Sequence, residues 1–73
     1  MNYQSHITLD PQVRFGRPCI VGTRIAVYDI LAWLSQGMSI PEILADFPEL
    51  EETHIRASLA YAADRGRRVK IAS

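Results

Sequence analysis

The chain has 73 residues, of which 48% are hydrophobic and 22% are charged, and its eight basic residues balance its eight acidic ones. A chain of this length buries only about 60–65% of the surface that it exposes when unfolded, so we predict a single domain over residues 1–73 that associates as a dimer or with a partner. The zero net charge argues against a protein that coats nucleic acid through bulk charge. No run of residues is apolar enough to span a bilayer, which predicts a cytoplasmic protein without a membrane partner.

The first part of the chain, about residues 6–26, is predicted to form a small antiparallel β-ribbon followed by a turn segment. Two short apolar stretches with strand periodicity, residues 7–9 and 19–21, are the predicted strands. Gly16 and Gly22 supply the positive φ angles that tight reversals require.

Two helices are predicted in the middle of the chain. The first covers about residues 27–36 and ends before Gly37, which stands where a helix C′ glycine belongs. The second begins after Ser39, a serine N-cap with Glu42 at the spacing of a capping box. Pro48 stops this second helix, because the residue before a proline is driven out of the α region.

A third helix is predicted from about 51 to 65. Its apolar side chains recur at i, i+4 and i+7, at Ile55, Leu59 and Ala62. Gly66 is predicted to end this helix, and residues 66–73 then form a basic tail. The predicted fold is therefore mostly α: a β-ribbon and then three helices over residues 27–65, the last two in helix-turn-helix order.

Groups suited to catalysis or metal binding are sparse. Cys19 falls in a predicted strand and is expected to be a small buried thiol, as free cysteines commonly are. His6 and His54 lack the close pairing of zinc ligands. We therefore predict no enzymatic activity, no cofactor and no metal site.

The basic residues suggest where DNA would bind. A helix-turn-helix normally contacts DNA through the start of its second helix, but here that start carries Glu49, Glu51 and Glu52. Docking there is disfavoured by repulsion from the phosphates. The candidate DNA-binding residues lie in the third helix and the tail: Arg56, Arg65, Arg67, Arg68 and Lys70. Complementarity to the helix dipole and a solvated tail explain these charges equally well.

Three aromatic residues are candidates for contact with another protein. Trp33 lies next to the apolar stripe of the first helix, and Tyr28 and Tyr61 also lie beside the apolar faces of their helices. Tryptophan and tyrosine are favoured at protein interfaces. The alternative is that all three simply form the edge of the core.

The segment GRPCIVGTRIAV, residues 16–27, resembles the hallmark segment of the domain of unknown function 433 family, and the resemblance extends over about residues 6–64. It implies a homeodomain-like helix-turn-helix fold with an N-terminal ribbon. It also implies a role similar to that of VapB-type antitoxins, which are encoded beside a PIN-like ribonuclease toxin. Our hypothesis is an antitoxin-like protein of a type II toxin-antitoxin system that binds a PIN-like toxin, with its own promoter DNA as a second target. The alternative is a pure protein-interaction module that does not bind DNA.

Local structure also explains the residues of this segment. Thr23 can hydrogen-bond nearby backbone, and Arg24 can pair with a carboxylate such as that of Asp29. The residues to which we assign a structural role are Gly16, Pro18, Gly22, Thr23 and Arg24. If Arg24 instead points outward, it joins Arg14 and Arg17 in a second basic surface.

Overall fold

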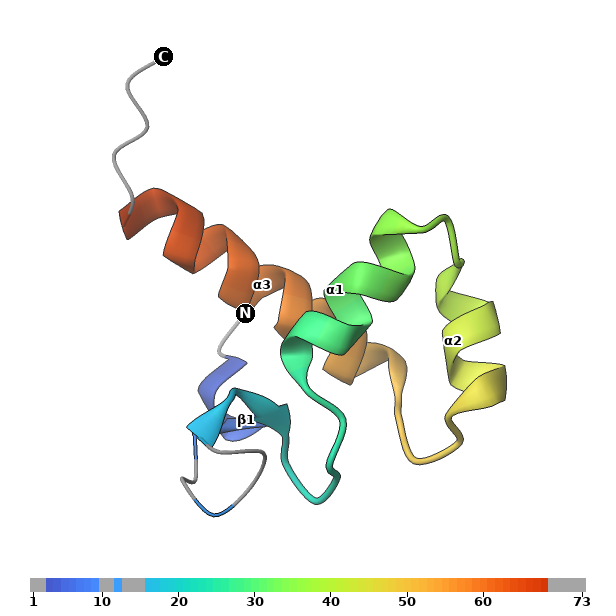
Figure 1. Ribbon diagram of the computed structural model, residues 1–73, viewed down its shortest axis with the longest axis horizontal. Coiled ribbons are helices and arrows are strands. Elements are labelled where there is room, and N and C mark those ends of the chain that lie inside the picture. Colours follow the sequence, from blue (N-terminus) through green and yellow to red (C-terminus); the bar gives the residue numbers. More distant parts are fainter. Residues whose placement is uncertain (1–2, 10–11, 13–15, 69–73) are drawn as a thin grey trace.

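The secondary structure follows the predicted order of a ribbon and three helices. The computed structural model describes residues 3–9, 12 and 16–68, the last two by their backbone alone. Its elements are η1 (Tyr3–Ser5), a single 3₁₀ turn, then β1 (Ile7–Thr8), β2 (Cys19–Ile20), α1 (Val27–Ser35), α2 (Ile40–Asp46) and α3 (Glu52–Arg68). The mostly α fold with a short N-terminal ribbon is therefore confirmed (Figure 1).

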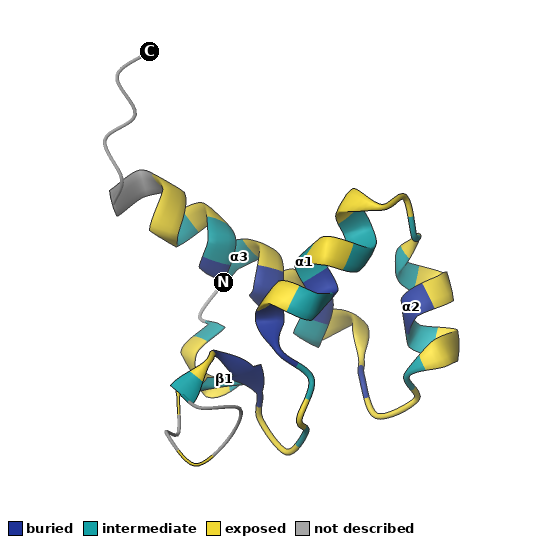
Figure 2. Ribbon diagram, viewed as in Figure 1, coloured by how far each residue is buried: buried dark blue, intermediate teal, exposed yellow. Residues whose placement is uncertain are grey.

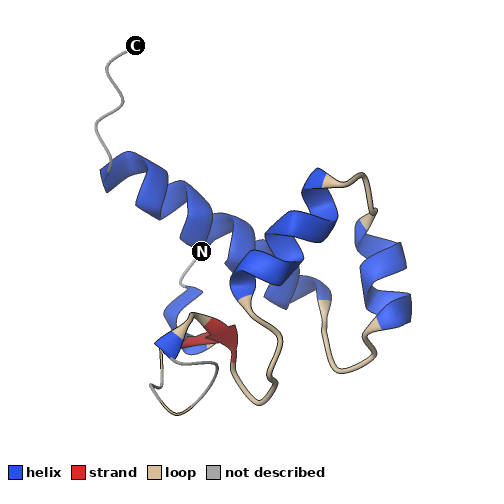
Figure 3. Cartoon of the chain, viewed as in Figure 1, coloured by secondary structure: helices blue, strands red, loops and turns tan. Residues whose placement is uncertain are grey.

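The ribbon is antiparallel and is joined to the first helix. Ile7 lies opposite Ile20, and Thr8 lies opposite Cys19. On its other side β2 forms a bridge to Ala26 through Cys19. The ribbon is therefore tied to the start of α1, and the strands occupy the small red area beside the helices in Figure 3.

The turn between β2 and α1 is held by Thr23, as predicted. Its hydroxyl donates to the carbonyl of Ile20 at 3.0 Å and accepts from the N–H of Ile25 at 3.0 Å. Gly22 has a φ of 81°, in the left-handed region that favours glycine. Gly16 has a φ of 80°, so the positive φ predicted for both glycines is confirmed.

Helix α1 ends in a Schellman motif. The N–H of Met38 donates to the carbonyl of Trp33 at 3.1 Å, and the N–H of Gly37 donates to that of Leu34 at 3.0 Å. Gly37 has a φ of 97°, which confirms its predicted role as the C′ glycine.

Helix α2 begins with the predicted capping box. The N–H of Glu42 donates to the Ser39 hydroxyl at 3.2 Å, and the N–H of Ser39 donates to Oε1 of Glu42 at 2.9 Å. Hydrogen bonds to the carboxylate from the backbone N–H and, secondarily, from the side chain of Ser39 favour its ionised form and lower the pKa of Glu42 from its ordinary value of 4.5.

The capping box predicts a pH-dependent stability. Because the pKa of Glu42 is lower in the folded chain than in the unfolded one, its contribution is complete above pH 4.5 and is lost as the pH falls through the lowered value. In Glu42→Gln the side chain keeps an acceptor but has no titratable charge. We expect the melting temperature of the wild type to exceed that of Glu42→Gln at pH 7, and the difference to shrink as the pH is lowered below 4.5. A difference that stays constant over this range would contradict the assignment.

Helix α3 is longer than predicted. It continues through Gly66 to Arg68, so the prediction that Gly66 ends the helix, and that the tail begins there, was wrong. The glycines with positive φ among the described residues are Gly16, Gly22 and Gly37, whereas Gly66 keeps helical backbone. Glycine permits a left-handed residue without imposing one, and the arginines that follow are good helix formers.

Replacement by alanine is therefore expected to have opposite effects on stability at Gly22 and at Gly66. A Cβ added at Gly22 or at Gly66 would meet no atom within 4 Å, so only backbone conformation decides the outcome. We expect Gly22→Ala to lower the free energy of unfolding by about 1–2 kcal/mol, since alanine is strained at positive φ. We expect Gly66→Ala to raise it by up to about 1 kcal/mol. Urea denaturation of the two variants checks this, and a loss for Gly66→Ala would contradict the helical assignment.

The core lies where the three helices and β2 meet. Figure 2 shows its buried residues in dark blue on the inner faces of α1, α2 and α3. The core cluster consists of Ile20, Val27, Ile30, Ile43, Leu50, Ile55 and Tyr61. Within the part of the chain that the structure describes, no helix is both long and apolar enough to cross a membrane.

The buried face of α3 differs from the predicted one. Ile55 is fully buried as predicted, but Leu59 is 45% exposed. The buried face instead continues through Ser58, whose hydroxyl donates to the carbonyl of His54 at 3.0 Å, and through Tyr61, which is 8% exposed. The face is set by α1 and η1, both of which pack against α3.

Candidate functional site

Three tyrosines from distant parts of the chain form a cluster between η1, α1 and α3. The rings of Tyr3 and Tyr61 lie edge to face with their centroids 5.8 Å apart, and those of Tyr28 and Tyr61 are 6.3 Å apart. The guanidinium of Arg65 lies 5.6 Å from the centre of the Tyr61 ring, and that of Arg17 lies 5.8 Å from the centre of the Tyr28 ring. We call Tyr3, Tyr28 and Tyr61 the tyrosine cluster.

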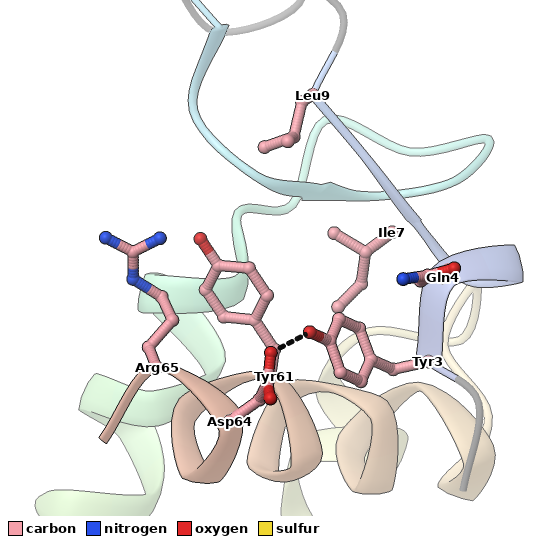
Figure 4. Close-up of a pocket in the computed structure, with 7 residues that line it drawn as sticks. All are labelled: Tyr3, Gln4, Ile7, Leu9, Tyr61, Asp64 and Arg65. Carbon is pink, nitrogen blue, oxygen red and sulfur yellow. Dashed lines mark hydrogen bonds between the residues drawn. The ribbon is translucent and has the colours of Figure 1, made fainter. Parts of the chain in front are cut away.

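A pocket of about 400 Å³ opens beside this cluster. It lies between the N-terminal segment and the C-terminal half of α3, as Figure 4 shows. The side chains that line it are Tyr3, Gln4, Ile7, Leu9, Tyr61, Asp64 and Arg65. The pocket therefore combines aromatic and aliphatic walls with an amide, a carboxylate and a guanidinium.

One hydrogen bond holds the two sides of the pocket together. The hydroxyl of Tyr3 donates to Oδ2 of Asp64 at 2.6 Å, across a separation of 61 positions in the sequence. A hydrogen bond to an ionised acceptor is stronger than one between neutral groups. It fixes η1 against α3 and so maintains the opening between them.

Burial sets the ionisation of the tyrosine at the centre of the cluster. It raises the pKa of the Tyr61 hydroxyl above its ordinary value of 10.0, and the neighbouring Tyr28 hydroxyl raises it further, while Arg65 acts in the opposite direction. The hydroxyl therefore stays protonated at neutral pH and remains a hydrogen-bond donor beside the pocket.

The two candidate DNA-binding residues whose side chains the structure describes, Arg56 and Arg65, do not lie on one face of α3. Nη2 of Arg56 lies 2.8 Å from Oε2 of Glu52, so this arginine is paired with a carboxylate one turn earlier. Arg65 follows Arg56 by nine positions, or two and a half turns, which places the two on opposite sides of the helix. The side chains of Arg67 and Arg68, and all of Lys70, lie outside the described residues.

The three aromatic candidates for protein contact have different surroundings. Tyr28 is 39% exposed. Trp33 is half-buried against the core and stacks on Phe47, with ring centroids 4.3 Å apart and planes inclined by 11°. Tyr61 belongs to the core, so its predicted position beside the apolar face of α3 was wrong.

The remaining structural residues lie at the junction of β2 and α1. Pro18 is buried, and its carbonyl accepts from the N–H of Val27 at 2.9 Å. Oδ2 of Asp29 accepts from the N–H of Ala26 at 3.2 Å and caps the start of α1, while Arg24 is exposed. The pairing of Arg24 with Asp29 stays a prediction, and Arg14 lies outside the described residues.

Cys19 and the two histidines do not form a common site. Cys19 is fully buried, which confirms the predicted core thiol. The rings of His6 and His54 lie edge to face with their centroids 5.8 Å apart. Nδ1 of His54 accepts from the N–H of Glu51 at 3.0 Å. Within residues 3–9, 12 and 16–68, no three histidine, cysteine or acidic side chains are arranged to hold a metal ion.

Sequence reasoning missed most of the residues that line the pocket. Tyr3, Gln4 and Leu9 gave no local signal, because their neighbours in the pocket come from α3. One signal was present: Tyr61, Asp64 and Arg65 are spaced i, i+3 and i+4, which places an aromatic ring and both charges on one helix face.

The fold and the pocket define a small three-helix domain with an N-terminal β-ribbon. A family model described as a protein of unknown function, DUF433, matches residues 7–62, and the chain therefore belongs to the DUF433 family. This confirms the resemblance seen in the sequence.

Two relatives of the chain illustrate this membership. The chain is 37% identical to the uncharacterized protein y4eO of Sinorhizobium fredii over 65 residues, covering 85% of this chain and 29% of that protein. It is 31% identical to a DUF433 member protein from Anabaena variabilis, whose crystal structure superposes with a TM-score of 0.81 and covers 89% of this chain and 64% of that one. The chain thus spans less than a third of the first relative and less than two thirds of the second.

Proposed function

We propose that the chain is an antitoxin-like component of a type II toxin-antitoxin system that binds and neutralises a PIN-like ribonuclease toxin. The observation that supports protein binding is the pocket beside the tyrosine cluster, with Arg65 at its edge and Leu9, 61% exposed, on its wall. Tyrosine and arginine are enriched where proteins bind one another. The class of partner is proposed from the family resemblance.

The charges at the start of α3 argue for a mainly protein-binding role. Glu51 and Glu52 are exposed there, and the nearby Arg56 is paired with Glu52. A DNA backbone brought to this turn would meet carboxylates and a cation that is already neutralised. These charges disfavour docking of DNA on the start of α3. They support the alternative function, a protein-interaction module without DNA binding.

Co-expression with the product of the adjacent gene tests the proposal. We expect the tagged chain to co-purify with a PIN-like protein and to abolish the ribonuclease activity that this protein shows alone. A folded chain that neither co-purifies with the toxin nor reduces its activity would overturn the proposal. We also propose that the chain acts in the cytoplasm and that it forms a dimer. Size-exclusion chromatography of the free chain tests the dimer.

Titration of promoter DNA at two salt concentrations distinguishes the two versions of the proposal. If promoter DNA is a second target, it binds through Arg65 and the basic residues after it, and its affinity falls steeply with added salt. The triple variant Arg65→Ala, Arg67→Ala, Arg68→Ala then loses binding, whereas Arg56→Ala keeps it. No binding by the wild type supports the protein-interaction module, whereas binding that does not weaken with salt contradicts docking through these arginines.

A further inference from the structure

We propose that the pocket binds an extended segment of the partner protein, with one large apolar side chain inside the pocket and one acidic side chain on Arg65. This inference rests on the proposed function that the chain binds a protein, and it names the kind of segment that is bound. It follows from the size of the pocket, the edge of β1 and the position of the charges.

The pocket has apolar walls and ample room for one large side chain. Its volume of about 400 Å³ lies near the lower end of the range for ligand pockets, which run from about 300 to 1,000 Å³. The rings of Tyr3 and Tyr61 and the side chains of Ile7 and Leu9 supply apolar surface. Leu9 is 61% exposed, so an apolar occupant would remove much of this surface from water.

The edge of β1 favours an extended segment. The N–H of Ile20 donates to the carbonyl of Ile25 at 2.9 Å, and the carbonyl of Ile20 accepts from the N–H of Thr23 at 3.0 Å. Both backbone groups of Ile20 therefore point away from β1. Ile7 and Ile20 are therefore a non-hydrogen-bonded pair, which places the N–H and C=O of Ile7 on the outer edge of β1. An added strand can bond there.

The alternating direction of the side chains along residues 7–9 would align an added strand with the pocket. Residues two positions apart in a strand point to the same side, and both Ile7 and Leu9 line the pocket. A peptide paired with the edge of β1 would present every second side chain on that side. Its side chains at i and i+2 would therefore lie along the pocket.

The charges select an acidic residue in the peptide. The carboxylate of Asp64 accepts from the Tyr3 hydroxyl at 2.6 Å, whereas the guanidinium of Arg65 lies over the Tyr61 ring (Figure 4). No carboxylate is seen paired with Arg65 among the residues that the structure describes. Arginine offers a fork of donors that matches a carboxylate, so a ligand carboxylate can bind there.

The test uses two capped peptides that differ in one charge. Acetyl-Thr-Phe-Thr-Glu-Thr-amide places the Phe and the Glu at i and i+2, and a matched peptide carries Gln in place of Glu. In an NMR titration we expect both peptides to shift the amides of Ile7, Leu9 and Tyr61. We expect the Glu peptide to bind about 5- to 10-fold more tightly, as a charge-assisted hydrogen bond would give.

Two arginine variants show whether this preference comes from the pocket. Arg65→Gln is expected to bind the Glu and Gln peptides equally, whereas Arg56→Gln, on the opposite side of α3, keeps the preference. Both residues are exposed, so both variants are expected to fold. Absence of shifts at the pocket, equal affinity of the wild type for the two peptides, or a preference retained in Arg65→Gln would overturn the proposal.

Two further comparisons complete the test. If acetyl-Thr-Phe with a free carboxylate binds more tightly than the capped Glu peptide, the occupant is a chain terminus and the extended segment is overturned. In the toxin co-purification, a complex that forms equally with wild type and Arg65→Gln, while neither peptide binds, overturns the pocket and leaves the proposed function standing. A Glu-selective pocket in a chain that does not bind the toxin supports the pocket and overturns the proposed function.

Discussion

Replacing Tyr61 by alanine is expected to lower the free energy of unfolding by about 3–5 kcal/mol, the usual cost of removing a large aromatic ring from a core. Tyr61 is 8% exposed and lies in the core cluster. Its ring is also the central member of the tyrosine cluster, between Tyr3 and Tyr28. Alanine would therefore leave a cavity and remove both ring contacts. Urea denaturation followed by circular dichroism measures the loss.

Tyr61→Phe is the matched control for this prediction. Phenylalanine keeps the ring and both edge-to-face contacts but lacks the hydroxyl. We expect it to cost no more than about 1.5 kcal/mol, the net value of an ordinary hydrogen bond. If Tyr61→Ala is no more destabilising than Tyr61→Phe, the ring does not contribute to the core as described.

Replacing Ile55 by alanine is expected to lower the free energy of unfolding by about 2–5 kcal/mol, as for other buried isoleucines. Ile55 is fully buried and faces the cluster formed by the three helices. In a domain of this size such a loss is a large part of the total stability, which is typically about 5–15 kcal/mol. The urea midpoint should therefore fall markedly.

Leu59→Ala is the control, because it removes apolar atoms from the same helix one turn later. Leu59 is 45% exposed, and we expect its replacement to change the stability by no more than about 0.5 kcal/mol. This comparison tests which face of α3 is buried. If Ile55→Ala and Leu59→Ala lower the free energy of unfolding equally, Leu59 is buried as the sequence pattern predicted, and the buried face described here is wrong.

The parts of the fold that could be predicted are those determined by neighbouring residues. Ser39 and Glu42 cap α2 through bonds that span three positions, and Gly37 ends α1 through bonds to the preceding turn. Thr23 likewise bonds to Ile20 and Ile25. Each of these interactions can be inferred from a short stretch of sequence, because both partners lie within it.

The buried face and the end of α3 could not be predicted in this way. The sequence pattern placed Leu59 in the apolar stripe of this helix and Tyr61 beside that stripe. The choice is made by η1, which brings Tyr3 against Tyr61, although the two residues are distant in the sequence. Gly66 is likewise ambiguous, because a glycine near basic residues is compatible with either the end or the continuation of a helix.

The candidate site was only partly predictable for the same reason. Arg65 was singled out for its charge and Tyr61 for its ring, but each was assigned to a different surface. The pocket joins them to residues of η1 and β1, for which no local pattern indicated a site. The spacing of Tyr61, Asp64 and Arg65 was the one available indication.

The long separation between Tyr3 and Asp64 also determines when the pocket can form during folding. Their hydrogen bond closes a loop of 61 positions, and closing such a loop lowers the conformational entropy of the chain. The bond therefore becomes favourable only after the helices have formed and restricted the intervening chain. We therefore expect the pocket to assemble late, and hydrogen exchange at η1 to be faster than at the centre of α3. A partner that needs the pocket would then recognise only chains that have finished folding.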